Sequence, residues 1–214
     1  MTGVERYHAF FRRISPHFRR KRIATFLHEI RPNDGDRILD IGGYPRNWQD
    51  VPIEAEIVTL NLEVAPGSEH LDRRCKPVAG DATDLPYADG SFEVVFSNSV
   101  IEHVGTWERQ QQFAREARRV GRKLWVQTPA RIFPVEPHYL APFIHWLPRA
   151  IRKRLIRNFT IFGWLHRPGE QQVETMLNEI RLLSKQELQL LFPDCTIVVE
   201  RWLGLTKSYV AVRS

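Results

Sequence analysis

The chain has 214 residues, of which 43% are hydrophobic and 26% charged, and its formal net charge is +6. These proportions are ordinary for a globular protein, and the length predicts one domain. No run approaches the roughly 18 apolar residues of a membrane span, and the first residues lack a signal peptide's apolar segment. Cys75 and Cys195 stand far apart without metal-ligand spacing. We therefore expect reduced thiols, no metal site and a cytoplasmic protein.

The first half of the chain alternates short apolar runs with turns. Residues 7–30 have helical spacing that Pro16 interrupts. Buried strands are predicted at residues 37–43, 57–63, 76–81, 92–99 and 123–129, with a helix through residues 108–120 before the last of them. The connections 44–56 and 64–76 contain prolines and show no helical stripe, so we expect this half of the sheet to be thinly covered.

The second half is less regular. Residues 130–175 are rich in proline, aromatic and basic residues, and we expect this insertion to form a cap on a single domain, residues 1–214, which opens with an N-terminal helical segment, residues 1–30. A helix then begins at Ser184, with Glu187 at the capping-box position. Strands at residues 195–204 and 207–213 are joined by a link around Gly204 that is too short for a parallel crossover, which predicts an antiparallel pair.

This order of elements predicts an α/β fold with a mostly parallel sheet covered on both faces. Such sheets bind ligands at the carboxyl ends of their strands. Polar and small residues stand there: Asp40-Ile41-Gly42-Gly43 after the first strand, Asn61 after the second, and Asp81-Ala82 after the third. A glycine turn without a ligand is the plain alternative for the first of these. The G-x-G-x-x-G fingerprint of a nicotinamide-dependent dehydrogenase is absent.

Three segments, RILDIGG, IVTLNLE and GDATDLPYADGSFEVVFSNSVIEHV, together resemble the class I S-adenosylmethionine-dependent methyltransferases, in particular those with a methyltransferase type 11 domain. The resemblance implies a Rossmann-like sheet with strand order 3-2-1-4-5-7-6, an antiparallel last strand, and S-adenosylmethionine as cofactor. Carried over by motif, it implies cofactor-binding roles for Asp40, Gly42 and Gly43 (methionine part), Asn61 (ribose), Asp81 and Ala82 (adenine), and Ser97 and Asn98 (amino-acid and methyl end).

Two departures from the family pattern stand at the first two strand ends. Tyr44 and Arg46 replace the second and third glycines of the first motif, and Asn61 replaces a carboxylate. An amide oxygen accepts a hydrogen bond without charge, so the change lowers the expected cofactor affinity. Glu63 shares a face with Asn61 only if the strand continues that far.

Methyl transfer to a hydroxyl is helped by a general base, and His103, close to the fourth strand end, is the leading candidate. A histidine that is merely hydrogen-bonded at a helix start is the plain alternative, and we expect Glu102 to be structural. Glu136 and His138 in the insertion are the second choice for contacts with the acceptor. The alternative for the insertion is a cap that only shields the core.

The acceptor predicted from this pattern is a small molecule, sugar or lipid-linked hydroxyl, because the motifs of nucleobase methyltransferases are absent. An RNA methyltransferase and a non-catalytic binding protein with this fold remain as alternatives. Basic and aromatic residues alternate through residues 149–164, which is typical of a helix that contacts an anionic membrane from its inner side. Solvated helix faces or ordinary amphipathic packing explain the same pattern.

Overall fold

The computed structural model describes residues 21–214; the expectations for residues 1–20, including the break at Pro16, lie outside this range. A seven-stranded sheet has the order β3-β2-β1-β4-β5-β9-β8. Its strands are β1 (Arg37–Ile41), β2 (Glu56–Asn61), β3 (Cys75–Ala79), β4 (Phe92–Asn98), β5 (Gly121–Pro129), β8 (Thr196–Trp202) and β9 (Leu205–Arg213). The strands β1 to β5 pair in parallel, and β9 is antiparallel to both β5 and β8. The predicted topology and terminal hairpin are confirmed.

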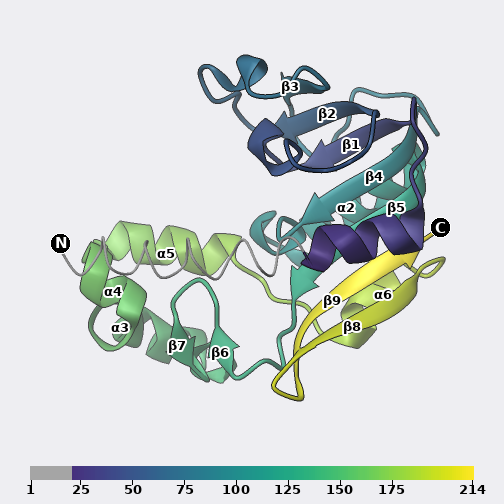
Figure 1. Cartoon of the computed structure of the whole chain (residues 1–214). Helices are drawn as coiled ribbons and strands as arrows, with labels where there is room; N and C mark the ends of the chain where they lie inside the picture. Colours follow the sequence, from purple (N-terminus) through teal and green to yellow (C-terminus); the bar gives the residue numbers. More distant parts are fainter. Residues whose placement is uncertain (1–20) are drawn as a thin grey trace.

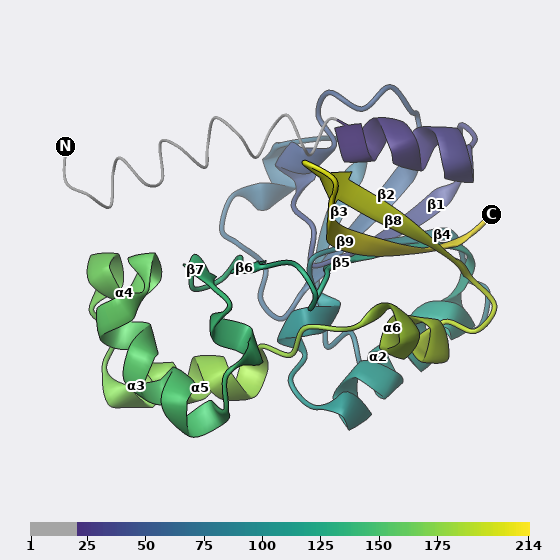
Figure 2. The ribbon, with the colours of Figure 1, turned by 90° about the horizontal axis from the view of Figure 1, so that it is seen from below.

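Alternation along the strands divides the core into two layers. In β4, Val94 and Phe96 join one cluster while Val95 joins the other, because successive side chains of a strand point to opposite faces. The helices α2 (Trp107–Val120) and α6 (Lys185–Leu191) cover one face, and the helical residues 21–30 cover the other, as Figure 2 shows. Because β4 is buried on both faces, the polar residues that end it stand where the strand reaches the carboxyl edge of the sheet.

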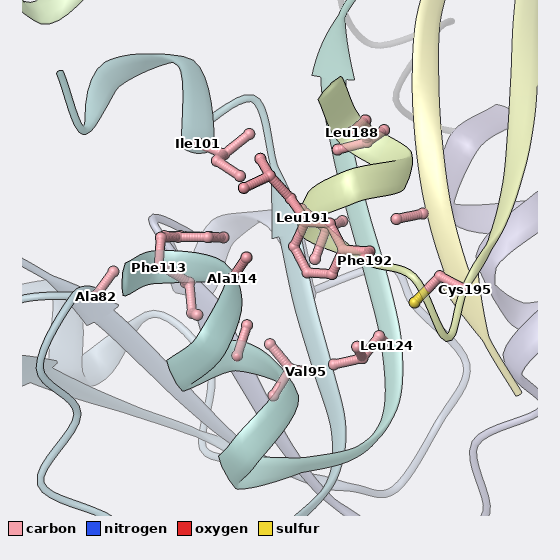
Figure 3. Packing of buried hydrophobic residues seen from close by; sticks show 14 of the residues in the cluster. Ala82, Val95, Ile101, Phe113, Ala114, Leu124, Leu188, Leu191, Phe192 and Cys195 are labelled. Atoms are coloured by element: carbon pink, nitrogen blue, oxygen red, sulfur yellow. The ribbon is translucent and has the colours of Figure 1, made fainter. Parts of the chain in front are cut away.

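The packing of α2 and α6 on the sheet follows their apolar stripes. Figure 3 shows Phe113 and Ala114 of α2 approaching Val95, with Leu188 and Leu191 of α6 alongside. The capping box predicted for α6 is present: the Ser184 hydroxyl accepts from the Glu187 backbone nitrogen, and the Glu187 carboxylate accepts from that of Ser184. These caps satisfy backbone groups that the first turn of a helix leaves without partners.

The covering of β1, β2 and β3 is thin, as predicted. Their connections contain only the short 3-10 turns η1 (Pro45–Asn47) and η2 (Ser68–His70). The expected ends of two strands shift: β2 stops at Asn61, so Glu63 lies beyond it, and β3 stops at Ala79, two residues before Asp81. Asp81 instead opens a turn, in which its backbone oxygen accepts from the nitrogen of Asp84.

Residues 131–182 form a lobe beside the sheet, on the side to which the β4 arrow points in Figure 1. It contains β6 (Val135–Glu136), β7 (Ala141–Pro142), the 3-10 turn η4 (Ile144–Trp146), α3 (Arg149–Phe159), α4 (Ile161–His166) and α5 (Glu170–Glu179). Its small core joins Tyr139, Ile156, Val173 and Leu177. The chain leaves and returns at one place, where Ala130 bridges Leu183. None of the helices within residues 21–214 is long and apolar enough to cross a membrane.

Candidate active site

The glycine turn after β1 is shaped by contacts within the protein. Gly42 has φ +75°, and a side chain there would collide with Val100. A Cβ atom on Gly43 would coincide with the carboxylate of Asp40, which is 1% exposed and accepts a hydrogen bond from the Trp48 indole at 2.7 Å. The two glycines therefore let the backbone pass closely over Asp40. Asp40 supports this turn from below.

The end of β2 holds the same turn from the side. The Asn61 amide nitrogen donates to the Gly43 carbonyl at 2.7 Å. Beyond it, Leu62 is 78% exposed, and Tyr44 on the neighbouring turn is 51% exposed. Exposed apolar side chains beside a polar edge provide surfaces on which a flat ring system can pack.

The end of β3 is held by hydrogen bonds. One Asp81 carboxylate oxygen accepts from the backbone nitrogen and hydroxyl of Thr83, both at 2.8 Å, and the other pairs with Arg109 at 2.9 Å. Burial raises the pKa of Asp81, but the bonds from Thr83 and Arg109 outweigh it and hold the pKa below its usual value. Ala82 is buried in the core below.

The end of β4 splits the predicted Ser97-Asn98 pair. Ser97 is fully buried and its hydroxyl donates to the Ile41 carbonyl at 3.3 Å, so it belongs to the core rather than to an open edge. The Asn98 side-chain oxygen accepts from Arg22 at 2.5 Å, and Arg22 also pairs with Glu200 at 2.8 Å. Together with both glycines, Arg22 and Asn98 line a cavity of about 30 Å³, which is roughly the share of one water molecule.

The three predicted catalytic residues come together although His103 is distant in the sequence from Glu136 and His138. His103 ends the 3-10 turn η3 (Ile101–His103) after β4, and His138 lies in the turn of the β6–β7 ribbon. Their Nε2 atoms are 3.1 Å apart, and the His138 Nδ1 atom is 2.6 Å from the Glu136 carboxylate. Glu136 is 1% exposed and also accepts from the Tyr139 backbone nitrogen at 2.6 Å.

The array shifts the pKa values of the two imidazoles in opposite directions. Burial and the neighbouring His138 charge lower the pKa of His103 to about 4. Burial also disfavours the charged form of His138, but the hydrogen bond and charge of Glu136 more than compensate and raise its pKa. A proton on the pair therefore resides on His138, and His103 is neutral at physiological pH.

Glu102 is a buried acid beside the array. It is fully buried, accepts from the Thr128 hydroxyl at 3.0 Å through one oxygen, and has no partner for the other within residues 21–214. Burial raises its pKa to about 7. Donor atoms of Glu102, His103 and His138 all lie within 4.8 Å of one another, close enough to hold a metal ion. This cluster was not predicted, because its third member, His138, comes from the lobe.

Comparison with known proteins agrees with this architecture. Residues 51–124 match the family described as "Methyltransferase domain". This match and the strand order of the sheet agree with the resemblance to the class I S-adenosylmethionine-dependent methyltransferases seen in the sequence. A curated Mycolicibacterium gilvum protein called "Uncharacterized methyltransferase" is 31% identical over 88 residues, covering 38% of this chain and 34% of that protein. The matched segment thus spans about a third of that relative's length.

Two solved structures share the fold across most of the chain. A Burkholderia thailandensis 1,6-didemethyltoxoflavin-N1-methyltransferase, solved with bound 1,6-didemethyltoxoflavin and S-adenosylhomocysteine, has a TM-score of 0.58 and 13% identity, covering 91% of this chain and 76% of its own. A SAM-dependent methyltransferase from Aquifex aeolicus has a TM-score of 0.52 and 13% identity, covering 89% of this chain and 87% of its own. At these identities the likeness concerns the fold.

Proposed function

We propose that the protein transfers a methyl group from S-adenosylmethionine to a hydroxyl of a small-molecule, sugar or lipid-linked acceptor. The observation that carries the proposal is the meeting of His103, at the end of β4, with the Glu136–His138 pair of the lobe. The family match over residues 51–124 supports the cofactor assignment. Carboxyl ends of parallel strands are the usual binding edge of such a sheet.

The residues that would hold the cofactor are Gly42, Gly43, Asn61, Asp81 and Asn98, with Leu62 and Tyr44 as apolar flanks. Their polar groups fit adenosine and an amino-acid tail, and the two glycines keep side chains out of the turn. The fit requires one rearrangement, because the cavity beside Asn98 is far smaller than a nucleoside. Arg22 must move from Asn98, and its charge is suited to the carboxylate of the incoming amino-acid part.

The array fixes which ring nitrogen can act as a base. When His138 is neutral, Glu136 keeps the proton on its Nδ1 atom, so its Nε2 atom accepts from His103. His103 then carries its proton on Nε2 and presents a bare Nδ1 atom. When His138 is protonated it donates to His103 instead, and Nδ1 of His103 is protonated. The base is therefore formed as the pH rises through the pKa of His138.

When bound, S-adenosylmethionine supplies a methyl group on a positively charged sulfur, which is already activated for transfer. The task of the chain is to orient the acceptor and accept its hydroxyl proton at His103 Nδ1 while the oxygen–carbon bond forms. From His103 the proton passes to His138, whose charge Glu136 stabilises, and then to solvent. The buried carboxylate thereby offsets a charge that burial alone would disfavour.

The test begins with calorimetric titration of S-adenosylmethionine and S-adenosylhomocysteine into the full chain. Release of S-adenosylhomocysteine is then followed with fractionated cell extract as the source of acceptor. His103→Ala and His138→Ala should slow release by roughly 10²- to 10⁴-fold with cofactor binding intact. His28→Ala is the matched control, since that side chain is 76% exposed on the helical residues 21–30. No binding of either nucleoside would contradict the proposal.

The same assay distinguishes a general base at His103 from a metal ion bound by Glu102, His103 and His138. Chelation with EDTA should leave the rate unchanged if His103 is the base, because a coordinated imidazole has no lone pair to accept a proton. Loss of release on chelation and its return with Zn²⁺ would assign these residues to a metal instead. Acceptors extracted only from the RNA fraction would favour RNA modification.

Peripheral contact with an anionic membrane is a second candidate role for the lobe. Phe159 is 74% exposed and Trp164 71% exposed, and basic side chains of Arg154 and Arg157 are exposed on the same helix as Phe159. Exposed aromatic and basic residues together favour the headgroup region of an anionic bilayer. Co-sedimentation with phosphatidylserine vesicles at low salt tests this role, and absence of binding eliminates it.

A further inference from the structure

A cavity that has no part in the proposed chemistry lies between the lobe and Gly105 and Thr106, just before α2. It has a volume of about 390 Å³, within the range of small-molecule sites. Four arginines line it, Arg131, Arg149, Arg152 and Arg181, against a single acidic lining residue, Glu136. We propose that this cavity binds a phosphoryl group of the acceptor, so that the substrate is a phosphorylated hydroxy compound. The part of this proposal that makes the phosphorylated compound the methyl acceptor rests on the proposed function.

Three of the four arginines are held in place by neighbouring groups. Arg149 donates to the Leu177 carbonyl at 3.1 Å and to the Asn178 side chain at 2.7 Å. Arg181 donates to the Gln110 side chain at 2.7 Å and pairs with Glu187 at 2.5 Å. Glu187 also pairs with Arg131 at 3.2 Å. Side chains fixed in this way lose little entropy when they meet an anion.

Arg152 differs from the other three. Among residues 21–214 its guanidinium group has no hydrogen-bond or ion-pair partner, and the Nε atom of that group is buried without one. A guanidinium group cannot discard its charge, so a buried donor of this kind costs free energy until an acceptor reaches it. An incoming anion would provide that acceptor.

Two further unpartnered groups line the same cavity. Tyr139 is 1% exposed, yet its hydroxyl has no partner within the described chain. His145 contacts the Arg131 carbonyl through Nε2 at 2.8 Å, and its buried Nδ1 atom is without a partner. Since Nε2 carries the proton that meets the carbonyl, Nδ1 of the neutral ring is an acceptor. The hydroxyl and the guanidinium offer donors to an anion, while Nδ1 suits a hydroxyl of the same ligand.

The donor inventory favours a phosphoryl group over a carboxylate. A carboxylate has two oxygens in one plane, whereas a phosphoryl group has three oxygens that accept from several directions. Donors around this cavity come from α3, from the segment that follows β5 and from the segment that follows α5. Arginine is the side chain whose fork matches phosphate oxygens best.

The cavity also reaches the catalytic array. Glu136 lines it and binds His138, which contacts His103. An acceptor anchored by its phosphoryl group would therefore have the rest of its length directed towards the histidine pair. Because Glu136 is the only acidic lining residue, the negative phosphoryl group is expected at the arginine end, away from that carboxylate.

The experiment measures binding of inorganic pyrophosphate and phosphate to the full chain by calorimetry. Arg152→Ala should weaken pyrophosphate binding by about tenfold or more, as removal of a charge-assisted partner does. The matched control is Arg154→Ala, an exposed arginine on the same helix, which should leave the dissociation constant unchanged. Tyr139→Phe keeps the shape of the buried ring and should weaken binding severalfold. Binding should fall with added salt.

Absence of pyrophosphate binding, equal losses in Arg152→Ala and Arg154→Ala, or tighter binding of citrate than of pyrophosphate would overturn the assignment. Titration of S-adenosylmethionine into the same samples separates the two proposals. Pyrophosphate binding without nucleoside binding supports the anion site and removes the acceptor role. Nucleoside binding without pyrophosphate binding leaves methyl transfer standing and refutes the phosphorylated substrate.

Discussion

The two regions that meet at the carboxyl edge of the sheet differ in how their polar groups are satisfied. At the β1–β2–β3 side, Asp40, Asn61 and Asp81 have hydrogen-bond partners inside the protein, and the adjoining cavity holds about 30 Å³. At the lobe side, Arg152, Tyr139 and Glu102 retain buried atoms without partners, and the cavity holds about 390 Å³. Family motifs mark the first region, whereas unsatisfied groups mark the second.

This contrast separates two kinds of functional evidence. A motif shows where a ligand binds in related proteins, while a buried unpartnered group shows where this chain bears an energetic cost that a ligand can relieve. The proposed cofactor site must rearrange before it can hold a nucleoside, whereas the proposed anion site is already open. Three substitutions test this difference, in order of decreasing effect.

The largest effect is expected from Gly43→Ala. The added methyl group would occupy the position of the Asp40 carboxylate, so the turn over β1 must shift or Asp40 must leave Trp48. Overpacking with loss of a buried hydrogen bond should lower the free energy of unfolding by about 3 kcal/mol or more. Urea denaturation measures it. Gly169→Ala is the control, since a Cβ atom there meets nothing within 4 Å; equal stability of the two variants would show that the turn is not internally locked.

The second largest effect is expected from Glu102→Gln, through the pH dependence of the free energy of unfolding. Burial raises the pKa of Glu102 in the folded state from 4.5 to about 7, so folding favours its protonated form. The contribution of Glu102 to the free energy of unfolding is therefore greatest below pH 4.5 and is lost as the pH rises through 7. The glutamine variant keeps an acceptor for Thr128 without the charge. At pH 8 it should be more stable than the native chain by on the order of 2–3 kcal/mol, with little difference at pH 4.

Denaturation in urea at pH 4, 6 and 8 follows this difference directly. Glu179→Gln, on the exposed side of α5, serves as the control and should show no comparable rise with pH. A native chain that is the more stable of the pair at pH 8 would show that the second Glu102 oxygen has a favourable partner there, and the contrast between the regions would then weaken.

The smallest effect is expected from Arg109→Ala. Arg109 and Asp81 are 47% and 42% exposed, so their ion pair should contribute no more than about 0.5 kcal/mol to stability. Removal of the arginine frees one Asp81 oxygen for the cofactor, and the affinity for S-adenosylmethionine should rise roughly threefold. Calorimetry measures the change. Weaker binding would mean that Arg109 itself contacts the ligand.

The sequence predicted the sheet well because its signals are local. Continuous apolar runs and the Ser184 capping box fixed the elements, and the short link at Gly204 fixed the antiparallel pair. Strand ends were less accurate: Ser97 lies in the core because its hydroxyl reaches the Ile41 carbonyl, a contact across strands that no pattern within β4 encodes.

The candidate site was predicted in part. His103, Glu136 and His138 were selected one by one, but their meeting depends on how the lobe folds back. Glu102 was expected to be structural, but its full burial was not predicted, because a charged side chain gives no sign of burial in the sequence. The arginine-lined cavity was missed because its arginines are spread over 51 positions, from Arg131 to Arg181. Only Arg149 and Arg152 belong to a basic stretch, and that stretch was interpreted as a solvated face or a packed amphipathic helix.

The bridge between Ala130 and Leu183 places the departure and return of the lobe side by side. A segment whose two ends adjoin can be lengthened, shortened or exchanged without disturbing the strands on either side of it. Residues 131–182 can thus change in sequence and length while the strands that carry the proposed cofactor site stay as they are. The lobe can therefore diversify in evolution while the sheet is inherited unchanged.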